Sequence, residues 1–212
     1  MAVISEVKRR SPSKGDLHPN LDPAVLARQY ESGGAACVSV LTDSQWFGGS
    51  VGDLRAARAA VGLPVLRKDF TVSAKDIADA RIMGADCVLL IVAALEQAEL
   101  VDFHQLATEL EMSALVEVHD ENELERAISA EATMIGVNQR DLVTFEVDQE
   151  RAVRVGAAIP AGVLRVAESG IRSRSDAEAL VQAGYHALLV GETLVKSGDP
   201  SRAVTELGGV RR

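Results

Sequence analysis

The sequence has few cysteines, no long apolar segment and no leader-like start. Its 212 residues include only two cysteines, Cys37 and Cys87, which cannot form a disulfide framework and fit a reducing cytoplasm. The longest unbroken apolar run, Cys87–Leu95, is about half of what a membrane-spanning helix requires. No basic residues followed by an apolar segment open the chain. We therefore expect a soluble cytoplasmic protein with no membrane partner.

Charge and histidine spacing argue against two further classes of function. The formal net charge is -9, and the one short basic run is Lys8-Arg9-Arg10. A sequence-independent nucleic-acid surface needs a basic face that displaces counterions, so we expect no nucleic-acid partner. The four histidines show no ligand spacing, and we expect no metal site. Small anionic molecules are still possible ligands, because binding them requires only local positive potential.

The chain does contain a strand-and-helix unit that repeats eight times. The apolar runs have the length and composition of buried parallel strands, and Asp22-Pro23 and Gly84 are typical helix boundaries. The predicted strands are Val3–Lys8, Cys37–Leu41, the run from Leu63 to Lys68, Cys87–Val92, Ala114–Val118, Met134–Asn138, Val163–Ala167 and Ala187–Val190. The predicted helices are 22–33, Val51–Val61, Ser73–Met83, Leu95–Met112, Glu121–Ala130, Asp148–Ile159, Ser173–Ala183 and Asp199–Leu207.

This alternation requires a parallel sheet, because each helix supplies a crossover between neighbouring strands. Eight such units in this length predict an α/β fold, a closed (β/α)8 TIM barrel that occupies residues 1–212 as a single domain. The competing architecture is a doubly wound open sheet. We disfavour it because no Gly-x-Gly-x-x-Gly follows the first strand and because eight parallel strands with short connections close naturally.

Ionisable and amide residues stand at the carboxyl ends of the predicted strands, which converge on one mouth in such a barrel. They are Glu6, Lys8, Lys68, Glu117, Asn138, Arg140 and Glu168. Each alone could line the barrel as part of a salt bridge, and Lys68 alone could extend to water. Together they indicate a site, because burying many charges is costly unless they pair. A lysine close to a second lysine is expected to have a lowered pKa, suited to a general acid.

Glycine-containing loops follow the last two predicted strands. Glu168-Ser169-Gly170 and Gly191-Glu192-Thr193 stand where barrels of this kind often bind phosphate on backbone N–H groups. Ser11, Ser13 and Lys14 in the first loop could add hydroxyl and ammonium donors. We expect a phosphorylated small molecule as ligand.

The assembled motifs resemble those of indole-3-glycerol phosphate synthases, the tryptophan-biosynthesis barrels. The segments that carry the resemblance are Ile4-Ser5-Glu6-Val7-Lys8, Ser11-Pro12-Ser13-Lys14-Gly15, Val38-Ser39-Val40-Leu41-Thr42, Leu66-Arg67-Lys68-Asp69-Phe70, Leu115-Val116-Glu117-Val118-His119, Ile135-Gly136-Val137-Asn138, Arg140-Asp141-Leu142, Val166-Ala167-Glu168-Ser169-Gly170-Ile171 and Val190-Gly191-Glu192. They run in order from end to end and coincide with strand ends.

The resemblance implies closure of 1-(2-carboxyphenylamino)-1-deoxyribulose 5-phosphate to indole-3-glycerol phosphate, with loss of carbon dioxide and water. Lys68 would protonate the ribulose carbonyl, and Glu117 would transfer a proton in the later dehydration. Lys8 would pair with the substrate carboxylate and is a second candidate acid for the departing hydroxyl. The remaining implied residues are Glu6, Asn138 and Glu168 for orientation, Ser11, Ser169, Gly170, Gly191 and Arg140 around the phosphate and substrate, and Phe47, Phe70 and Leu89 along an aromatic pocket. These residues would supply a general acid, a proton-transfer group and a phosphate-binding site without a cofactor, and we expect no cofactor.

Several residues receive no catalytic role. Cys37 and Cys87 are expected to pack in the core, and His119 is expected at the surface near the mouth. Trp46 could either cover the substrate ring or shield the rim of the barrel, and the sequence favours neither role. Members of the resembled family usually carry a helical extension before the first strand, whereas this sequence opens on that strand.

Three functions stay open on these grounds. The synthase is preferred, and we expect it to be a monomer. A related isomerase that acts on phosphoribosylanthranilate would want a cysteine base at the tip of the first strand, where this chain has Glu6 and Lys8. The third candidate is a barrel that binds the phosphorylated ligand without turnover, or with impaired turnover, because the extension is missing.

Overall fold

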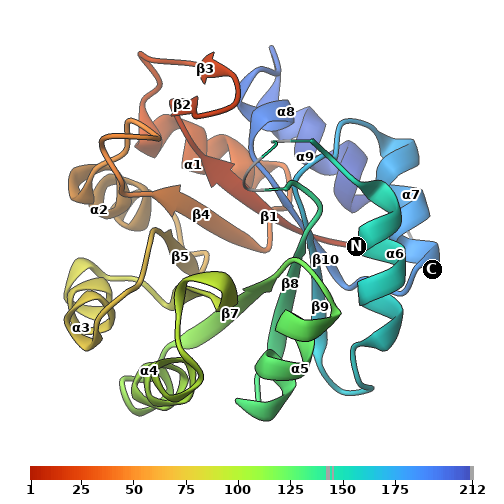
Figure 1. Cartoon of the computed structure of the whole chain (residues 1–212). Coiled ribbons are helices and arrows are strands. Elements are labelled where there is room, and N and C mark those ends of the chain that lie inside the picture. Colours follow the sequence, from red (N-terminus) through yellow and green to blue (C-terminus); the bar gives the residue numbers. More distant parts are fainter. Residues whose placement is uncertain (142–143, 145, 211–212) are drawn as a thin grey trace.

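A closed barrel of eight parallel strands forms the centre of the molecule, and helices surround it (Figure 1). The computed structural model describes residues 1–141, 144 and 146–210. The barrel strands are β1 (Ala2–Val7), β4 (Cys37–Leu41), β5 (Val65–Lys68), β6 (Cys87–Ile91), β7 (Ser113–Val118), β8 (Met134–Asn138), β9 (Leu164–Glu168) and β10 (Ala187–Val190). β1 pairs with both β4 and β10, which closes the ring. The predicted (β/α)8 barrel is confirmed, and the open sheet is wrong.

The helices lie on the outside of the ring and follow the strands in sequence. They are α1 (Pro23–Ser32), α2 (Val51–Ala60), α3 (Ala74–Met83), α4 (Gln97–Glu109), α5 (Glu121–Ser129), α6 (Gln149–Ala158), α7 (Arg174–Gln182), α8 (Glu192–Val195) and α9 (Pro200–Gly208). The predicted boundaries of α1 are confirmed: the Asp22 carboxylate accepts the backbone N–H groups of Ala24 and Val25 at 2.8 and 3.0 Å. Gly84 ends α3 in the left-handed conformation, with φ of 99°.

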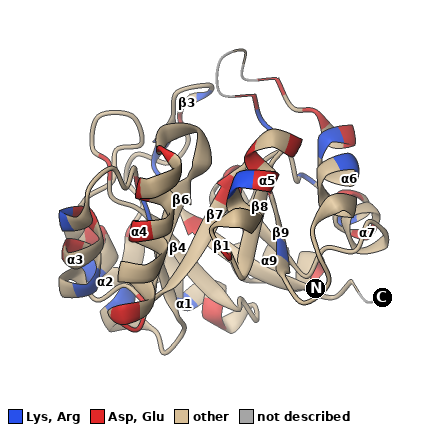
Figure 2. Ribbon diagram, turned by 60° about the horizontal axis from the view of Figure 1, so that its bottom comes forward, with Lys and Arg blue, Asp and Glu red and all other residues tan. Residues whose placement is uncertain are grey.

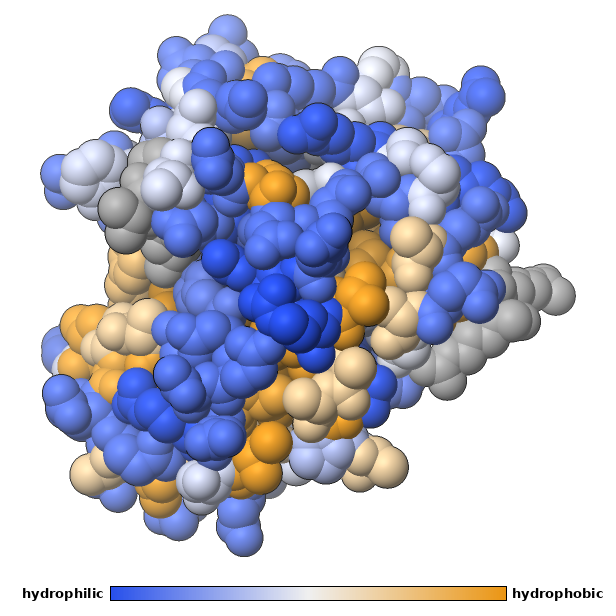
Figure 3. Space-filling model, turned by 45° about the vertical axis from the view of Figure 1, so that its right-hand side comes forward, coloured by the Kyte–Doolittle hydropathy of each residue, from blue (hydrophilic) through white to orange (hydrophobic). Residues whose placement is uncertain are grey.

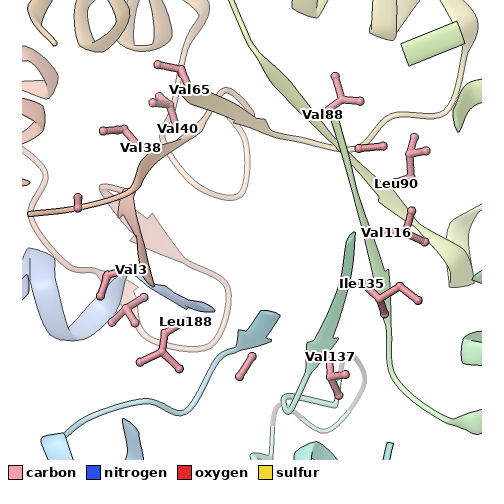
Figure 4. Packing of buried hydrophobic residues seen from close by; sticks show 14 of the residues in the cluster. Val3, Val38, Val40, Val65, Val88, Leu90, Val116, Ile135, Val137 and Leu188 are labelled. Carbon is pink, nitrogen blue, oxygen red and sulfur yellow. The ribbon is translucent and has the colours of Figure 1, made fainter. Parts of the chain in front are cut away.

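Alternation along the strands divides the buried apolar residues into two clusters. Outward-facing residues such as Val38, Val88 and Val116 project toward the helices and form the larger cluster (Figure 4). The inner cluster includes Leu66, Leu115 and other inward-facing residues that fill the barrel below its mouth. The strands are therefore buried on both faces, and this explains why the sequence shows continuous apolar runs instead of strict alternation.

Three short elements differ from the predicted layout. A small antiparallel hairpin, β2 (Arg10–Ser11) and β3 (Gly15–Asp16), occupies the loop after β1. A 3-10 turn, η1 (Val92–Ala94), and α8 lie after β6 and β10. Each is too short to produce a periodic pattern in the sequence. The helix predicted over Leu95–Met112 is also shorter than expected, because α4 begins at Gln97 after the Glu96 cap and ends at Glu109.

The two ends of the barrel carry different features. Charged residues are spread over the outer helices, and both termini lie at the end opposite the β2–β3 hairpin (Figure 2). The face shown in Figure 3 is mainly hydrophilic with scattered apolar patches. Within residues 1–141, 144 and 146–210, no helix combines the length and apolar character that crossing a bilayer demands.

Candidate active site

A pocket of about 1120 Å³ opens at the carboxyl ends of the barrel strands. Every residue predicted from the strand ends and from the resemblance lines it. These residues are Glu6, Lys8, Ser11, Phe47, Lys68, Phe70, Leu89, Glu117, Asn138, Arg140, Glu168, Ser169, Gly170 and Gly191. Leu142, which belongs to one of the quoted motifs, lies outside the described residues. The barrel thus brings together side chains that are up to 185 positions apart, from Glu6 to Gly191.

Lys68 projects from the end of β5 and contacts two carboxyl groups. Its Nζ atom lies 3.5 Å from Glu117 Oε2 and 3.6 Å from Glu168 Oε2, and its side chain is 15% exposed. Burial alone would lower the pKa of Lys68, but the charges of Glu117, Glu168 and Glu6 outweigh it and raise the pKa. The expected lowering by a second lysine is therefore wrong. Lys68 is held as an ammonium ion that can donate a proton.

Glu117 and Glu168 have pKa values shifted in opposite directions although both are almost fully buried. Burial opposes the ionised form of Glu117, yet Lys68 lowers the pKa of Glu117 below its usual value. Burial and the neighbouring Glu117 charge raise the pKa of Glu168. The ionised form is therefore favoured at Glu117 and the protonated form at Glu168. Opposite shifts of this kind distinguish a proton acceptor from a hydrogen-bond donor within one pocket.

A second ion pair lies at the end of β1. Lys8 Nζ is 2.5 Å from Glu6 Oε1, and both side chains face the pocket. Gly191 packs against this pair: a β-carbon at this position would overlap Glu6 Oε1 and lie 3.1 Å from Lys8 Nζ. Gly191 therefore makes room for the pair in addition to its predicted place beside phosphate.

Asn138 connects the Lys68 cluster to the loop after β8. Its Nδ2 atom donates to Glu117 Oε1 at 3.1 Å, and its Oδ1 atom accepts the backbone N–H of Arg140 at 3.0 Å. The Glu117 carboxylate is consequently held on one oxygen by Asn138 and on the other by Lys68. The same asparagine fixes the start of the segment that carries Arg140.

The loops after β9 and β10 form the opposite wall of the pocket. Ser169 and Gly170 both have positive φ, 66° and 71°, which turns the backbone sharply after Glu168. Gln139, to which the sequence analysis gave no role, donates through Nε2 to the carbonyl of Ser169 at 2.9 Å. Thr193 Oγ1 donates to the carbonyl of Ile171 at 2.7 Å and ties the two loops together. These hydrogen bonds fix the positions of the two loops, whose backbone N–H groups can donate to an oxyanion.

Positive side chains flank this wall. Lys14, at the turn of the β2–β3 hairpin, and Lys196, after α8, both line the pocket with Ser11. Burial opposes ionisation of Glu192, but the charges of Lys196, Lys14 and Lys8 contribute to lowering the pKa of this carboxyl. Lys196 Nζ also lies 3.0 Å from Glu192 Oε1, and the two lysines contribute positive potential to this wall in a chain that is negative overall.

Apolar side chains line the remaining part of the mouth. Leu89 is buried at the pocket floor, whereas Phe70 is 47% exposed and Phe47 is half-buried. Trp46, for which two roles were open, also lines the pocket and is 49% exposed. Large apolar surfaces left open beside a polar cluster suit a ligand with both an aromatic ring and charged groups.

His119 and the cysteines were set aside, and the structure corrects one of these expectations. His119 is not a surface residue: its side chain is 11% exposed and lies between Glu117 and Glu123. Cys87 is buried and Cys37 half-buried, and burial raises the pKa of both thiols, that of Cys37 to about 12. Among the residues that the structure describes, no group of three or more His, Cys, Asp or Glu side chains could hold a metal ion.

The Gly136→Ala substitution is expected to reduce turnover while the barrel still folds. A β-carbon at Gly136 would overlap Glu168 Oε1 and approach Leu115 Cδ1 to 3.1 Å, so the Glu168 carboxyl group must shift from its position 3.6 Å from Lys68 Nζ. We expect a loss in kcat of about 100-fold, the effect of displacing a catalytic group by about 1 Å. Gly198→Ala is the matched control, since nothing lies within 4 Å of its added carbon. Equal kcat in both variants would show that the position of Glu168 is unimportant.

Comparisons with known sequences match this chain to one protein family over nearly its whole length. A family profile described as indole-3-glycerol phosphate synthase matches residues 1–207. The indole-3-glycerol phosphate synthase of Mycobacterium ulcerans (strain Agy99) is 55% identical over 207 residues, which cover 98% of this chain and 76% of the relative. The protein of the same name from Nocardioides sp. (strain ATCC BAA-499 / JS614) is 54% identical over 209 residues, covering 99% of this chain and 80% of the relative.

Solved structures show the same fold at much lower identity. Thiamine phosphate pyrophosphorylase from Pyrococcus furiosus superposes with a TM-score of 0.74 at 16% identity, covering 98% of this chain and 94% of that one. A 3-hexulose-6-phosphate synthase gives a TM-score of 0.76 at 16% identity, with 99% of both chains covered. At this identity the likeness concerns the fold alone.

Proposed function

The chain belongs to the indole-3-glycerol phosphate synthase family, and we infer that its barrel mouth closes the indole ring. The enzyme converts 1-(2-carboxyphenylamino)-1-deoxyribulose 5-phosphate to indole-3-glycerol phosphate, releasing carbon dioxide and water. It is a carboxy-lyase of tryptophan biosynthesis. The observation that carries the residue assignment is the position of Lys68, an ammonium group that contacts the carboxyl groups of Glu117 and Glu168 in a pocket that apolar and lysine side chains also line.

In the first step, Lys68 donates a proton to the ribulose carbonyl oxygen while the ring carbon that bears the carboxylate attacks the carbonyl carbon. This places positive charge beside an oxygen that becomes negative in the transition state. Lys8 pairs with the substrate carboxylate until carbon dioxide leaves and the ring regains its aromatic electrons. Glu6 supports this assignment, because its contact with Lys8 fixes the ammonium group at the mouth.

In the second step, a hydroxyl leaves as water and a proton is removed from the neighbouring carbon. Glu117 accepts that proton, since Lys68 and Asn138 keep this buried carboxylate ionised and oriented. Lys8 is the candidate acid for the departing hydroxyl. Glu168, whose protonated form is favoured by burial and by the Glu117 charge, orients substrate hydroxyls.

The phosphate and the aromatic ring occupy opposite parts of the pocket in this proposal. Ser11, Ser169, Gly170 and Gly191 bind the phosphate, with Arg140 as an added contact to the substrate. Phe47, Phe70 and Leu89 enclose the carboxyphenyl ring, and Trp46 covers it from the rim. Placing both ends of the substrate brings the two reacting carbons together, which removes much of the entropic part of the barrier.

We further propose that residues 1–212 form one domain that acts as a cytoplasmic monomer. The described residues contain no candidate membrane span, and the relatives are named as biosynthetic synthases. The free thiols of Cys37 and Cys87 are compatible with a reducing compartment. Light scattering over a range of concentrations tests the monomer, and a mass that doubles would contradict it.

Turnover of the proposed substrate tests the function directly. Purified chain is incubated with 1-(2-carboxyphenylamino)-1-deoxyribulose 5-phosphate, and indole fluorescence is followed over time. We expect product with this substrate and none with phosphoribosylanthranilate. Isomerisation of the latter would instead favour the isomerase. A rise in melting temperature with the first compound but no product would indicate a barrel that only binds.

A further inference from the structure

His119 lies directly behind the catalytic carboxylate and outside the pocket lining. It follows the last residue of β7 and precedes α5, and its ring bridges the two elements. Nδ1 is 3.0 Å from Glu123 Oε2, and the backbone N–H of His119 donates to the same oxygen at 2.8 Å. Nε2 is 3.4 Å from Glu117 Oε1. Glu123, His119 and Glu117 therefore form a row that leads from the helix to the strand end.

The Nε2 atom is the feature that calls for an explanation. It is fully buried and lies within ion-pair distance of Glu117, yet no acceptor in the described part of the chain satisfies hydrogen-bond geometry around it. A buried polar atom without a partner is unfavourable, unless a charge interaction compensates it. Glu117 is the group that can supply this interaction, since it is an anion and its Oε1 atom is the nearest acceptor recorded for Nε2.

Charged groups from three elements act on the ring. Glu117 on β7 and Glu123 on α5 favour the imidazolium, while Arg151 on α6 opposes it. Burial also disfavours the charged form, but the Glu123 hydrogen bond and the two carboxylates outweigh it, and the pKa of His119 is raised. In return the imidazolium helps Lys68 to lower the pKa of Glu117. The two carboxylates on either side of the ring thus favour its charged form.

We propose that His119 is a positioning residue that compensates the charge of Glu117 and keeps this carboxylate aimed at Lys68. The inference rests on the proposed function, because it assigns Glu117 the proton transfer. Lys68 contacts Oε2 of Glu117, while Asn138 and His119 face Oε1. His119 touches no substrate and acts through Glu117 alone.

The pH profile of kcat separates this role from simple packing. Removing an opposite charge at this distance raises the pKa of a carboxylate by about one unit or more. Glu117 must be ionised to accept a proton, so in His119→Asn the acidic limb of the profile moves to higher pH by that amount. On that limb we expect kcat about tenfold below the parent value, with convergence at high pH and little change in KM. A uniform loss at all pH values, or an unchanged profile, would overturn the proposal.

Two further variants keep the test decisive if His119→Asn folds poorly. His119→Gln can reach Glu117 with a neutral amide, and we expect the same displacement of the acidic limb. Glu123→Gln removes the outer carboxylate and should move the limb in the same direction by a smaller amount. His104→Asn, on α4 away from the pocket, is the control and should leave the profile unchanged.

Histidine titration by nuclear magnetic resonance tests the coupling independently of turnover. We expect the His119 ring to titrate at higher pH than an unperturbed histidine in the parent chain and at lower pH in Glu117→Gln than in the parent. The same His119 titration in both chains would overturn the inference even if the enzyme is active. An inactive parent with a coupled His119 would instead contradict the proposed function while supporting the His119–Glu117 pair.

Discussion

The Lys68→Ala variant is expected to lose nearly all synthase activity while its barrel still folds. Lys68 is the proposed proton donor to the carbonyl oxygen, and no other ammonium group is recorded in contact with Glu117 or Glu168 among the described residues. Loss of a positioned acid costs about 10²–10⁴-fold in kcat, and we expect the upper end because the same charge stabilises the developing oxyanion. Indole fluorescence in steady state measures the loss, and near-parental kcat would remove Lys68 from the mechanism.

The same substitution should make stability depend on pH in a specific direction. Lys68 lowers the pKa of both Glu117 and Glu168, so without it burial is expected to take the folded pKa of Glu117 above its unfolded value and to raise further the already elevated pKa of Glu168. The native state then binds more protons than the unfolded state, and the free energy of unfolding falls as pH rises. Urea titrations of parent and variant at pH 5 and pH 8 should therefore diverge at the higher pH. Lys68→Met, which fills the space, should diverge in the same way.

The Glu117→Gln variant is expected to show the second-largest loss, in kcat and not in substrate affinity. The amide cannot accept a proton in the dehydration step, and a positioned base contributes about 10²–10⁴-fold. The barrel should tolerate this change, because Glu168 loses the neighbouring charge that raises its pKa and can ionise beside Lys68. The remaining carboxylate keeps the buried ammonium group paired.

A matched control for this variant is Glu121→Gln, which changes an exposed carboxylate paired with Arg154 at the start of α5. We expect its kcat to equal that of the parent. Single-turnover traces of Glu117→Gln should show normal carbon dioxide release followed by slow indole formation, because Glu117 acts after decarboxylation. Slow carbon dioxide release would place Glu117 in the first step.

Most of the fold could be predicted because it is encoded in local patterns. A strand buried on both faces must be a continuous apolar run, and Asp22-Pro23 marks a helix start wherever the helix later packs. The shared location of the charged residues at the strand ends could be predicted from the same local patterns. Parallel strands in a barrel all end at one mouth, so Lys68 and Glu117 had to share it although they are 49 residues apart.

The electrostatics of the site could not be predicted, because pKa values depend on distances between units. The sequence places Lys8 and Lys68 at the same mouth but does not say which carboxyl each one contacts. In the structure Lys8 pairs with Glu6 and Lys68 lies between Glu117 and Glu168, so the pKa of Lys68 rises instead of falling.

His119 was missed for a different reason. It lies two residues after Glu117, so strand alternation places both side chains on the same side of the chain, and Glu123 follows four residues later. From the sequence we instead expect His119 at the surface near the mouth, because spacing alone does not show that the Glu117 and Glu123 carboxyl groups enclose its ring. The hairpin β2–β3 and helix α8 left no such signal, because elements of two to four residues have no detectable period.

The most direct measurement uses substrate labelled with carbon-13 in its carboxyl group, in a single turnover with enzyme in excess. If the barrel mouth performs decarboxylating ring closure, labelled carbon dioxide and indole-3-glycerol phosphate form in equal amounts, and Lys68→Met yields neither. Indole without carbon dioxide, carbon dioxide without indole, or no product from a folded chain that binds the substrate would contradict the proposed reaction.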